Sequence, residues 1–209
     1  MRKNITVIFS VIFSVLIITS IVKFTVGFKQ LYYFDIDYLN ISALSGLSKE
    51  DIKKNYDYMI DYNLDKNKKE FELPSIKYSE NGKFHFEEVR DIFQILNKIF
   101  NISLLLSVIG LVINILNKNI EFLKITSRAL ILIPLILILP IVVNFDGSFV
   151  LFHKIMFNND YWIFDPNLDP VINILPEEFF FHAGLMILIL TIIASLTNYL
   201  IYRLLKREH

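Results

Sequence analysis

Two histidines, His85 and His153, are the strongest candidates for chemistry in this 209-residue chain. Imidazole gains and loses a proton near neutral pH, so a pair of histidines suits general acid–base catalysis. His153 lies in residues 152–182, a stretch that contains two of the four histidines and the only tryptophan among many aromatic, acidic and proline residues. We therefore expect a functional site in this stretch, with His85 contributed from another part of the chain.

A structural explanation of residues 152–182 competes with this one. Tyr161 and Trp162 are typical of the aromatic belt that membrane proteins carry at the water interface. Asp169 and Glu177 each adjoin a proline, and acids beside proline are typical of helix starts. Each residue alone favours the structural explanation, as His182 does at the start of an apolar segment. Only their grouping indicates a site.

Missing residue types narrow the chemistry. The chain has no cysteine, which excludes thiol nucleophiles, thiolate metal sites and disulfides. Neither a G-x-S-x-G nor an H-E-x-x-H motif is present. Glu88 follows His85 at helical spacing and could hold a metal together with His153, so a metal-dependent membrane hydrolase or protease is one alternative. A non-enzymatic binding or sensor protein is another. Zero net charge argues against a nucleic-acid partner.

Four apolar segments predict an all-α membrane protein with four transmembrane helices, at about residues 5–28, 95–116, 128–144 and 180–202. No small-residue cleavage site follows the first segment, so we expect it to be retained. Residues 29–92 and 145–179 join the segments on one side of the membrane. We expect the former to be a small folded cap and the latter an active-site loop.

Local signals indicate how the cap folds. Ser48 and Asp51 form a capping-box pattern that predicts a helix through Leu64. Its apolar positions recur at helical spacing, so one face is expected to be buried. The pair Asn81-Gly82 lies between alternating residues and predicts a β-hairpin turn. The cap is thus expected to combine helix with a hairpin.

The charges predict that both termini are cytoplasmic and that the cap is extracellular, because short inner segments are rich in Lys and Arg. These segments hold only two acids, Glu121 and Glu208. Their eight basic residues are Arg2, Lys3, Lys118, Lys124, Arg128, Arg203, Lys206 and Arg207. The second and third spans are joined by a short inner connection, which makes them antiparallel neighbours. Their outer ends are then close, which could bring His85 and His153 together.

Two stretches resemble the signatures of the lipoprotein intramolecular transacylases. Residues 79–93, SENGKFHFEEVRDIF, resemble that family's S-x-x-G…HF-x-x-V-[K/R]-x-x-F element, with Arg90 where lysine is common. Phe152-His153, Phe157, Trp162 and residues 169–180 resemble its second signature. The order of spans and loops is similar along the whole chain.

The resemblance implies an enzyme of Gram-positive-type bacteria that moves the sn-2 acyl chain of an S-diacylglyceryl cysteine onto the α-amine of the same lipoprotein. It implies that His85 and His153 are catalytic. We expect Phe157, Tyr161 and Trp162 to wall the substrate pocket, and Arg90, Asp169 and Glu177 to contribute to substrate binding. No metal or cofactor is expected. The expected partners are the lipoprotein N terminus and membrane lipid, while the oligomeric state is open.

Overall fold

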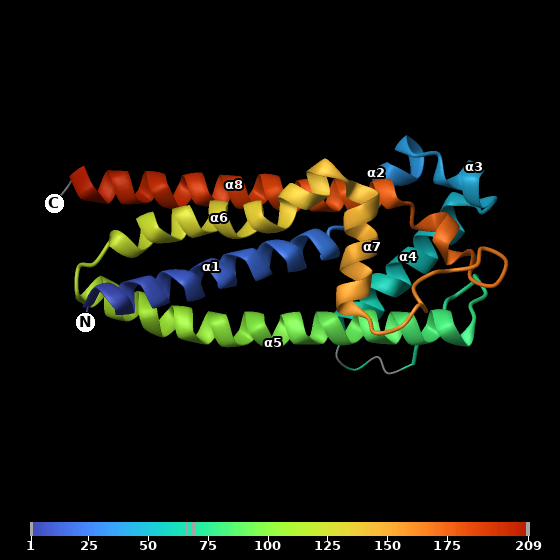
Figure 1. Cartoon of the computed structure of the whole chain (residues 1–209), viewed down its shortest axis with the longest axis horizontal. Helices are drawn as coiled ribbons and strands as arrows, with labels where there is room; N and C mark the ends of the chain where they lie inside the picture. The colour runs from blue at the N-terminus through green and yellow to red at the C-terminus, as the bar shows by residue number, and fades with distance from the viewer. Residues whose placement is uncertain (1, 66, 68–69, 208–209) are drawn as a thin grey trace. The chain divides into compact units, whose positions relative to one another are not determined.

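Every regular element of the described chain is a helix. The computed structural model describes residues 2–65, 67 and 70–207, without the side chains of residues 2 and 136–142. The expected charges of Arg2 and Glu208 therefore lie outside the described side chains. In chain order the helices are α1 (Arg2–Gly27), α2 (Lys29–Tyr38), α3 (Ile41–Ser45), α4 (Lys49–Leu64), α5 (Glu80–Leu116), α6 (Glu121–Val143), α7 (Phe145–Met156), the 3-10 helix η1 (Pro170–Ile174) and α8 (Glu177–Arg207) (Figure 1).

The chain divides into two compact units. The bundle unit comprises residues 1–25, 96–143 and 185–209, and the cap unit comprises residues 26–95 and 144–184. Both stretches that we expected outside the membrane, 29–92 and 145–179, fall in the cap unit. All candidate site residues therefore belong to one unit, and their mutual geometry is defined within it.

The bundle unit contains α1, α6 and the adjoining parts of α5 and α8, which run side by side (Figure 1). Small polar residues join its helices. Ser10 Oγ on α1 donates to the Phe122 carbonyl of α6 at 3.3 Å, and Ser195 Oγ on α8 donates to the Ser127 carbonyl of α6 at 2.7 Å. Such short side chains let helix backbones approach closely in a membrane.

Three described helices, α1, α5 and α8, are long and apolar enough to cross a bilayer. The predicted third span falls on α6, which is helical over its whole range, although the side chains of residues 136–142 lie outside the description. That α6 also crosses the membrane stays a prediction.

The cap unit has its own apolar core. Ser48 caps α4 as expected, because its Oγ accepts a hydrogen bond from the Asp51 backbone N–H at 3.0 Å. The predicted inner face of α4 is confirmed, since Ile52, Tyr56 and Met59 are all buried. They pack with residues from α2, the loop after α4, α5, η1 and α8. These contacts fix the first two turns of α5 and of α8, which carry His85 and His182.

The predicted hairpin at Asn81-Gly82 is wrong, because both residues lie in the first turn of α5. Ser79 starts this helix: its Oγ accepts from the Gly82 N–H at 3.0 Å. Gly82 is needed for close approach rather than for a turn, since a Cβ there would lie 2.2 Å from Asp169 Oδ1. The pair Asn-Gly favours a hairpin only when two strands flank it, and here a helix cap holds the segment.

Residues 145–179 are more ordered than the expected loop. They form α7 and η1, joined by a turn-rich segment. Asn144 caps α7 by accepting from the Gly147 N–H at 3.0 Å. His153 lies in the last turn of this helix, so a helix rather than a loop determines its position.

Candidate active site

The cap unit brings His85 and His153 together. Their ring centroids are 6.0 Å apart, although the residues are 68 positions apart in the chain (153 − 85). His85 comes from the second turn of α5 and His153 from the last turn of α7. The expected proximity of the two side chains is thus confirmed, and we call them the histidine pair.

Aromatic rings surround the histidine pair. Phe157 lies beside both histidines, with its centroid 4.7 Å from that of His85 and 5.7 Å from that of His153. Trp162 stacks on His153 at 4.8 Å, and Phe149 lies 4.3 Å from the same ring. Two of the expected wall residues, Phe157 and Trp162, therefore contact the pair, in which His85 is buried and His153 is partly exposed.

Burial keeps the histidine pair neutral. His85 is 6% exposed, and desolvation, helped by the proximity of His153, lowers its pKa to about 4. Desolvation also lowers the pKa of His153, and a hydrogen bond to the Phe149 carbonyl partly offsets this effect. A charged imidazolium is disfavoured where water is excluded. Both rings are consequently neutral at physiological pH.

A backbone contact determines the tautomer of His153. Its Nδ1 lies 2.8 Å from the Phe149 carbonyl oxygen, which is only an acceptor, so Nδ1 carries the proton and donates it. In the neutral ring, Nε2 then holds a lone pair. His85 differs, because its Nδ1 is buried and has no hydrogen-bond partner in the described part of the chain. The two histidines thus offer different chemical groups.

Asn159 organises the segment that carries Trp162, and sequence reasoning missed it. Its Nδ2 donates to both oxygens of Glu88, at 2.9 and 3.1 Å, and its carbonyl accepts from Trp162 Nε1 at 3.1 Å. Glu88 follows His85 by three residues on α5, so Asn159 connects the His85 helix to the ring that stacks on His153. The polar run Asn158-Asn159-Asp160 between aromatic residues was the only signal in the sequence.

Asp169 fixes the start of the helix that carries His85. It is 4% exposed, and its two carboxylate oxygens accept from the Ser79 N–H and from Ser79 Oγ, both at 2.7 Å. Since Ser79 in turn caps α5 at Gly82, one buried carboxylate determines where the helix begins. His85 lies six residues after Ser79, so its position depends on this contact.

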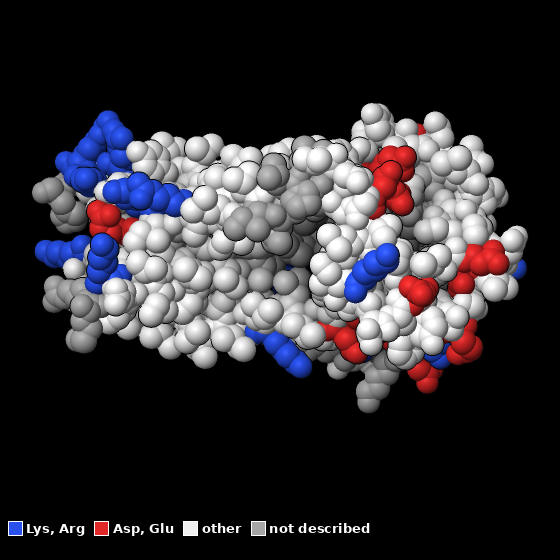
Figure 2. Space-filling model, viewed as in Figure 1, with Lys and Arg blue, Asp and Glu red and all other residues white. Residues whose placement is uncertain are grey.

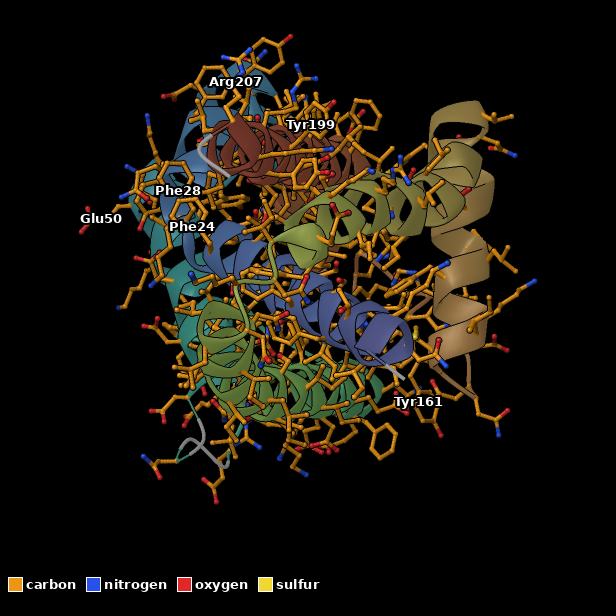
Figure 3. The ribbon with its side chains drawn as sticks, turned by 90° about the vertical axis from the view of Figure 1, so that its left-hand side faces the viewer. Phe24, Phe28, Glu50, Tyr161, Tyr199 and Arg207 are labelled. Atoms are coloured by element: carbon orange, nitrogen blue, oxygen red, sulfur yellow. The ribbon has the colours of Figure 1, made fainter. Side chains whose placement is uncertain are left out.

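The three remaining candidates, Arg90, Tyr161 and Glu177, have partners other than the histidine pair. Arg90 packs over the Tyr62 ring at 5.3 Å and donates to the Asp65 carbonyl at 3.4 Å. Tyr161 (Figure 3) is 39% exposed, and its ring centroid lies 5.4 Å from that of Phe84.

Glu177 is exposed in the first turn of α8. Partial burial raises its pKa, and the neighbouring carboxylate of Asp146 adds to the effect. A role of Arg90, Tyr161 and Glu177 in substrate binding stays a prediction.

The proposed metal triad of His85, Glu88 and His153 is not assembled. Within the described residues, no group of three His, Cys, Asp or Glu side chains is placed to hold a metal ion. Glu88 instead binds Asn159 through both of its carboxylate oxygens. The two neutral imidazoles can accept or donate a proton, and aromatic rings surround them.

A second histidine contact lies in the same unit and had no signal in the sequence. His182 Nδ1 lies 2.8 Å from Asp35 Oδ1, and we call this contact the Asp35–His182 pair. Asp35 is completely buried on α2, while His182 is partly exposed on α8. Desolvation raises the pKa of Asp35, and His182 acts against that rise. This pair joins two helices of the cap core.

Comparisons with known proteins identify the family of this chain. A family model described as lipoprotein intramolecular transacylase Lit matches residues 7–180. A structure of the membrane-integral lipoprotein intramolecular transacylase Lit from Bacillus cereus shares 40% identity and superimposes with a TM-score of 0.95, covering 100% of this chain and 97% of that one. Comparison with curated protein sequences gave no match.

Two further structures of the Bacillus cereus transacylase carry the substitutions H85R and H85A in that protein. Each is 39% identical with a TM-score of 0.91, covering 100% of this chain and 93% and 94% of those chains. The family match spans most of the sequence, and the structural match spans all of it. The chain therefore belongs to the lipoprotein intramolecular transacylase family, whose members are acyltransferases.

Proposed function

We propose that this membrane enzyme transfers the sn-2 acyl chain of an S-diacylglyceryl cysteine to the α-amine of the same cysteine at a lipoprotein N terminus. The product is an N-acyl lipoprotein with a free glyceryl hydroxyl, and His85 and His153 handle the proton. The observation that carries the proposal is the pairing of two neutral, differently bonded imidazoles under aromatic rings. Membership of an acyltransferase family also removes the alternative of a non-enzymatic sensor.

His153 is the proposed base. The α-amine nitrogen attacks the ester carbonyl carbon, forming a C–N bond, and the nitrogen must then lose a proton. His153 Nε2 holds the lone pair that accepts it, because Nδ1 is bonded to the Phe149 carbonyl. The C–O bond to the glyceryl oxygen then breaks, and the imidazolium returns the proton to that oxygen. No acyl-enzyme forms, which agrees with a chain that contains no cysteine.

His85 is the proposed donor to the developing oxyanion. Because its pKa is about 4, its ring stays neutral and keeps a single N–H for hydrogen bonding. A neutral imidazole in a desolvated site can polarise a carbonyl without transferring its proton. His85 also has the same number as the histidine that is replaced in two structures of the Bacillus cereus relative.

Water exclusion accounts for the aromatic walls. Water would hydrolyse the same ester that the amine attacks, so transfer requires a site in which the amine is the nearer nucleophile. Phe157 and Trp162 contact the histidine rings and limit access of water to them. Holding two ends of one substrate together gives an intramolecular reaction an advantage of up to about 7–11 kcal/mol. Asp169 is a positioning residue in this scheme, since it acts through Ser79 and the start of α5.

The proposed orientation places both termini in the cytoplasm, α6 as the third of four spans, and the cap unit at the outer membrane surface. The distribution of Lys and Arg supports it. So does α7, which exposes Leu151, Ile155 and Met156 and resembles a helix that lies in the membrane interface. His153 on this helix would then meet the diacylglyceryl group where the lipid headgroups end.

A diacylglyceryl lipopeptide whose two acyl chains differ in length tests the proposal. Purified protein is incubated with it, and the product is analysed by tandem mass spectrometry. The intact mass should stay constant while the free amine disappears, and the nitrogen should carry the sn-2 chain. Loss of one chain to water would refute the transfer, and the sn-1 chain on nitrogen would refute the assigned position.

A further inference from the structure

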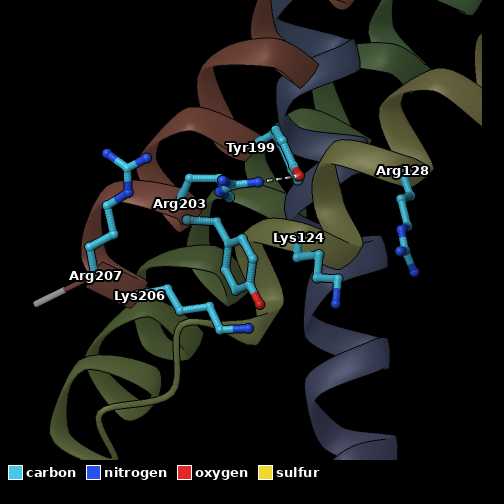
Figure 4. A pocket seen from close by; sticks show the side chains of 7 residues that line it. Lys124, Arg128, Tyr199, Arg203, Lys206 and Arg207 are labelled. Carbon is cyan, nitrogen blue, oxygen red and sulfur yellow. Dashed lines mark hydrogen bonds between the residues drawn. The ribbon is translucent and has the colours of Figure 1, made fainter. Parts of the chain in front are cut away.

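The bundle unit has a second concave feature that takes no part in the proposed reaction. A cavity of about 450 Å³ lies between the final turns of α8 and the first turns of α6 (Figure 4). We call it the basic cavity, because two lysines, three arginines and two tyrosines line it: Lys124, Arg128, Tyr199, Tyr202, Arg203, Lys206 and Arg207. Its lining therefore carries five positive charges and no acid.

The basic side chains lie closer together than the usual excess of Lys and Arg on the cytoplasmic side of a membrane protein requires. Lys124 from α6 and Lys206 from α8 place their Nζ atoms 5.6 and 5.7 Å from the centre of the same Tyr202 ring. Arg203 donates to Tyr199 Oη at 3.3 Å. Among the described residues, none of the five cations forms a salt bridge. One carboxylate adjoins the cluster, because Glu121 accepts a hydrogen bond from Tyr202 Oη at 3.0 Å, so the five positive charges remain in excess. They repel each other, and a bound anion would relieve that repulsion.

Two neighbouring stripes of side chains, one polar and one apolar, run along the final turns of α8. Tyr199, Arg203 and Arg207 recur every four residues and line the cavity. Beside them, Leu196, Leu200 and Leu204 recur at the same interval, and each is more than half exposed. Residues four apart lie on one helix face, so a polar stripe and an apolar stripe run next to each other. Figure 2 shows the blue side chains gathered at this end of α6 and α8.

We propose that the basic cavity binds the phosphate headgroup of an anionic glycerophospholipid, with its acyl chains along the leucine stripe of α8. Guanidinium groups suit phosphate oxygens because they donate in a planar fork. A volume of about 450 Å³ lies in the range of small-ligand sites. The adjoining apolar stripe favours a lipid over free phosphate. In the proposed orientation, this lipid belongs to the inner leaflet.

Lipid retention measures the preference directly. The purified full chain is reconstituted in nanodiscs with equal amounts of phosphatidylglycerol and phosphatidylcholine of identical acyl chains, then released and analysed by native mass spectrometry. We expect about tenfold preferential retention of phosphatidylglycerol, the ratio that one charge-assisted contact of about 1.4 kcal/mol provides. Equal retention of the two lipids would overturn the proposal, and this measurement needs no variant.

A matched pair of variants locates the site. Lys124→Gln with Arg203→Gln removes two charges from the cavity, while Lys3→Gln with Lys118→Gln removes two charges from residues that do not line it. Only the first double variant should lose the preference. The same loss in both would show a general charge effect and would overturn the assignment to this cavity.

Inorganic phosphate distinguishes the two sources of the anion. The melting temperature is measured in phosphatidylcholine nanodiscs, with and without added phosphate, and in nanodiscs that contain phosphatidylglycerol. Phosphatidylglycerol should raise the melting temperature of the wild type and inorganic phosphate should not. If phosphate alone raises it as much, the cavity recognises a free anion and the lipid assignment is wrong.

Discussion

Two histidine contacts in the cap unit differ in what faces the imidazole. In the histidine pair, His85 and His153 meet each other and aromatic rings, and burial lowers the pKa of both. In the Asp35–His182 pair, the imidazole meets a fully buried carboxylate that joins α2 to α8. A base for catalysis needs an available lone pair, whereas a structural histidine needs a partner that occupies it. The partner, rather than the residue type, therefore separates the proposed catalytic role from the structural one.

Removing an imidazole of the histidine pair is expected to have the largest effect. His153→Ala and His85→Ala should each lower the transfer rate by about 10²–10⁴-fold, the usual contribution of a positioned acid–base group. Rates are measured by mass spectrometry of the lipopeptide product, and folding by thermal unfolding. His182→Ala is the control within the same unit, and it should retain activity per folded molecule. A rate near that of the wild type in His153→Ala would remove this residue from the mechanism.

Breaking the Asp35–His182 pair should change stability instead of chemistry. Asp35→Ala removes the buried carboxylate that is hydrogen-bonded to His182 and leaves the imidazole without this partner. The free energy of unfolding should fall by about 1–3 kcal/mol. We expect a lower melting temperature and an activity per folded molecule within about twofold of the wild type, since the change lies below the scale of a lost acid–base group. Asp37→Ala, an exposed acid on the same helix, is the matched control. A hundredfold loss of activity at full stability would mean that this pair belongs to the catalytic site.

The start of α5 tests how strongly the geometry of the histidine pair depends on Asp169. In Gly82→Ala, the new Cβ would lie 2.2 Å from Asp169 Oδ1, so the carboxylate must leave Ser79 or the helix start must shift. Activity should fall by about tenfold, as expected for a displaced but intact acid–base group. The fall should appear in kcat more than in KM.

Gly184→Ala is the matched control for that substitution. Gly184 is also helical and lies in the same unit, but a Cβ there meets no atom within 4 Å. Alanine favours helix by about 0.5–1 kcal/mol over glycine, so this variant should be active and slightly more stable. Equal losses of activity in both variants would contradict a specific role for the contact between Gly82 and Asp169.

Local sequence patterns predicted the parts of this fold that depend on neighbours in the chain. The cap of α4 at Ser48, its buried face and the apolar helices follow from residues within a few turns. The proximity of His85 and His153 followed from the connection between two spans together with the family signatures. The hairpin failed because Ser79 is bonded to Asp169, 90 residues away, and no local pattern records that contact.

The Asp35–His182 pair and Asn159 show the same limit. Asp35 and His182 are separated by 147 residues, and Asn159 and Glu88 by 71. Each residue alone is typical of a helix face or a turn, so its type carries no information about its partner. Only the packing of the cap core determines these contacts. The sequence therefore predicted the two histidines but not the residues that support them.

The stability of the protein should depend on pH with opposite signs in the two pairs. The pKa of His85 falls from 6.5 to about 4 on folding, so the folded state binds fewer protons between those values. Its contribution to stability is complete above pH 6.5 and is lost as the pH falls toward 4. The pKa of Asp35 is raised from 3.8, so its contribution is complete below pH 3.8 and is lost as the pH rises through the folded value.

Thermal unfolding of wild type, His85→Phe and Asp35→Asn between pH 4 and pH 7 separates these contributions. Relative to the wild type, His85→Phe should lose less stability on acidification, with a slope smaller by up to about 1.4 kcal/mol per pH unit. Asp35→Asn should lose less stability as the pH rises. Between pH 7 and pH 6, the change in the free energy of unfolding should differ between His85→Phe and the wild type by less than about 1 kcal/mol. Parallel curves for His85→Phe and wild type would mean that His85 titrates near its ordinary pKa, and the neutral oxyanion donor would then have no physical basis.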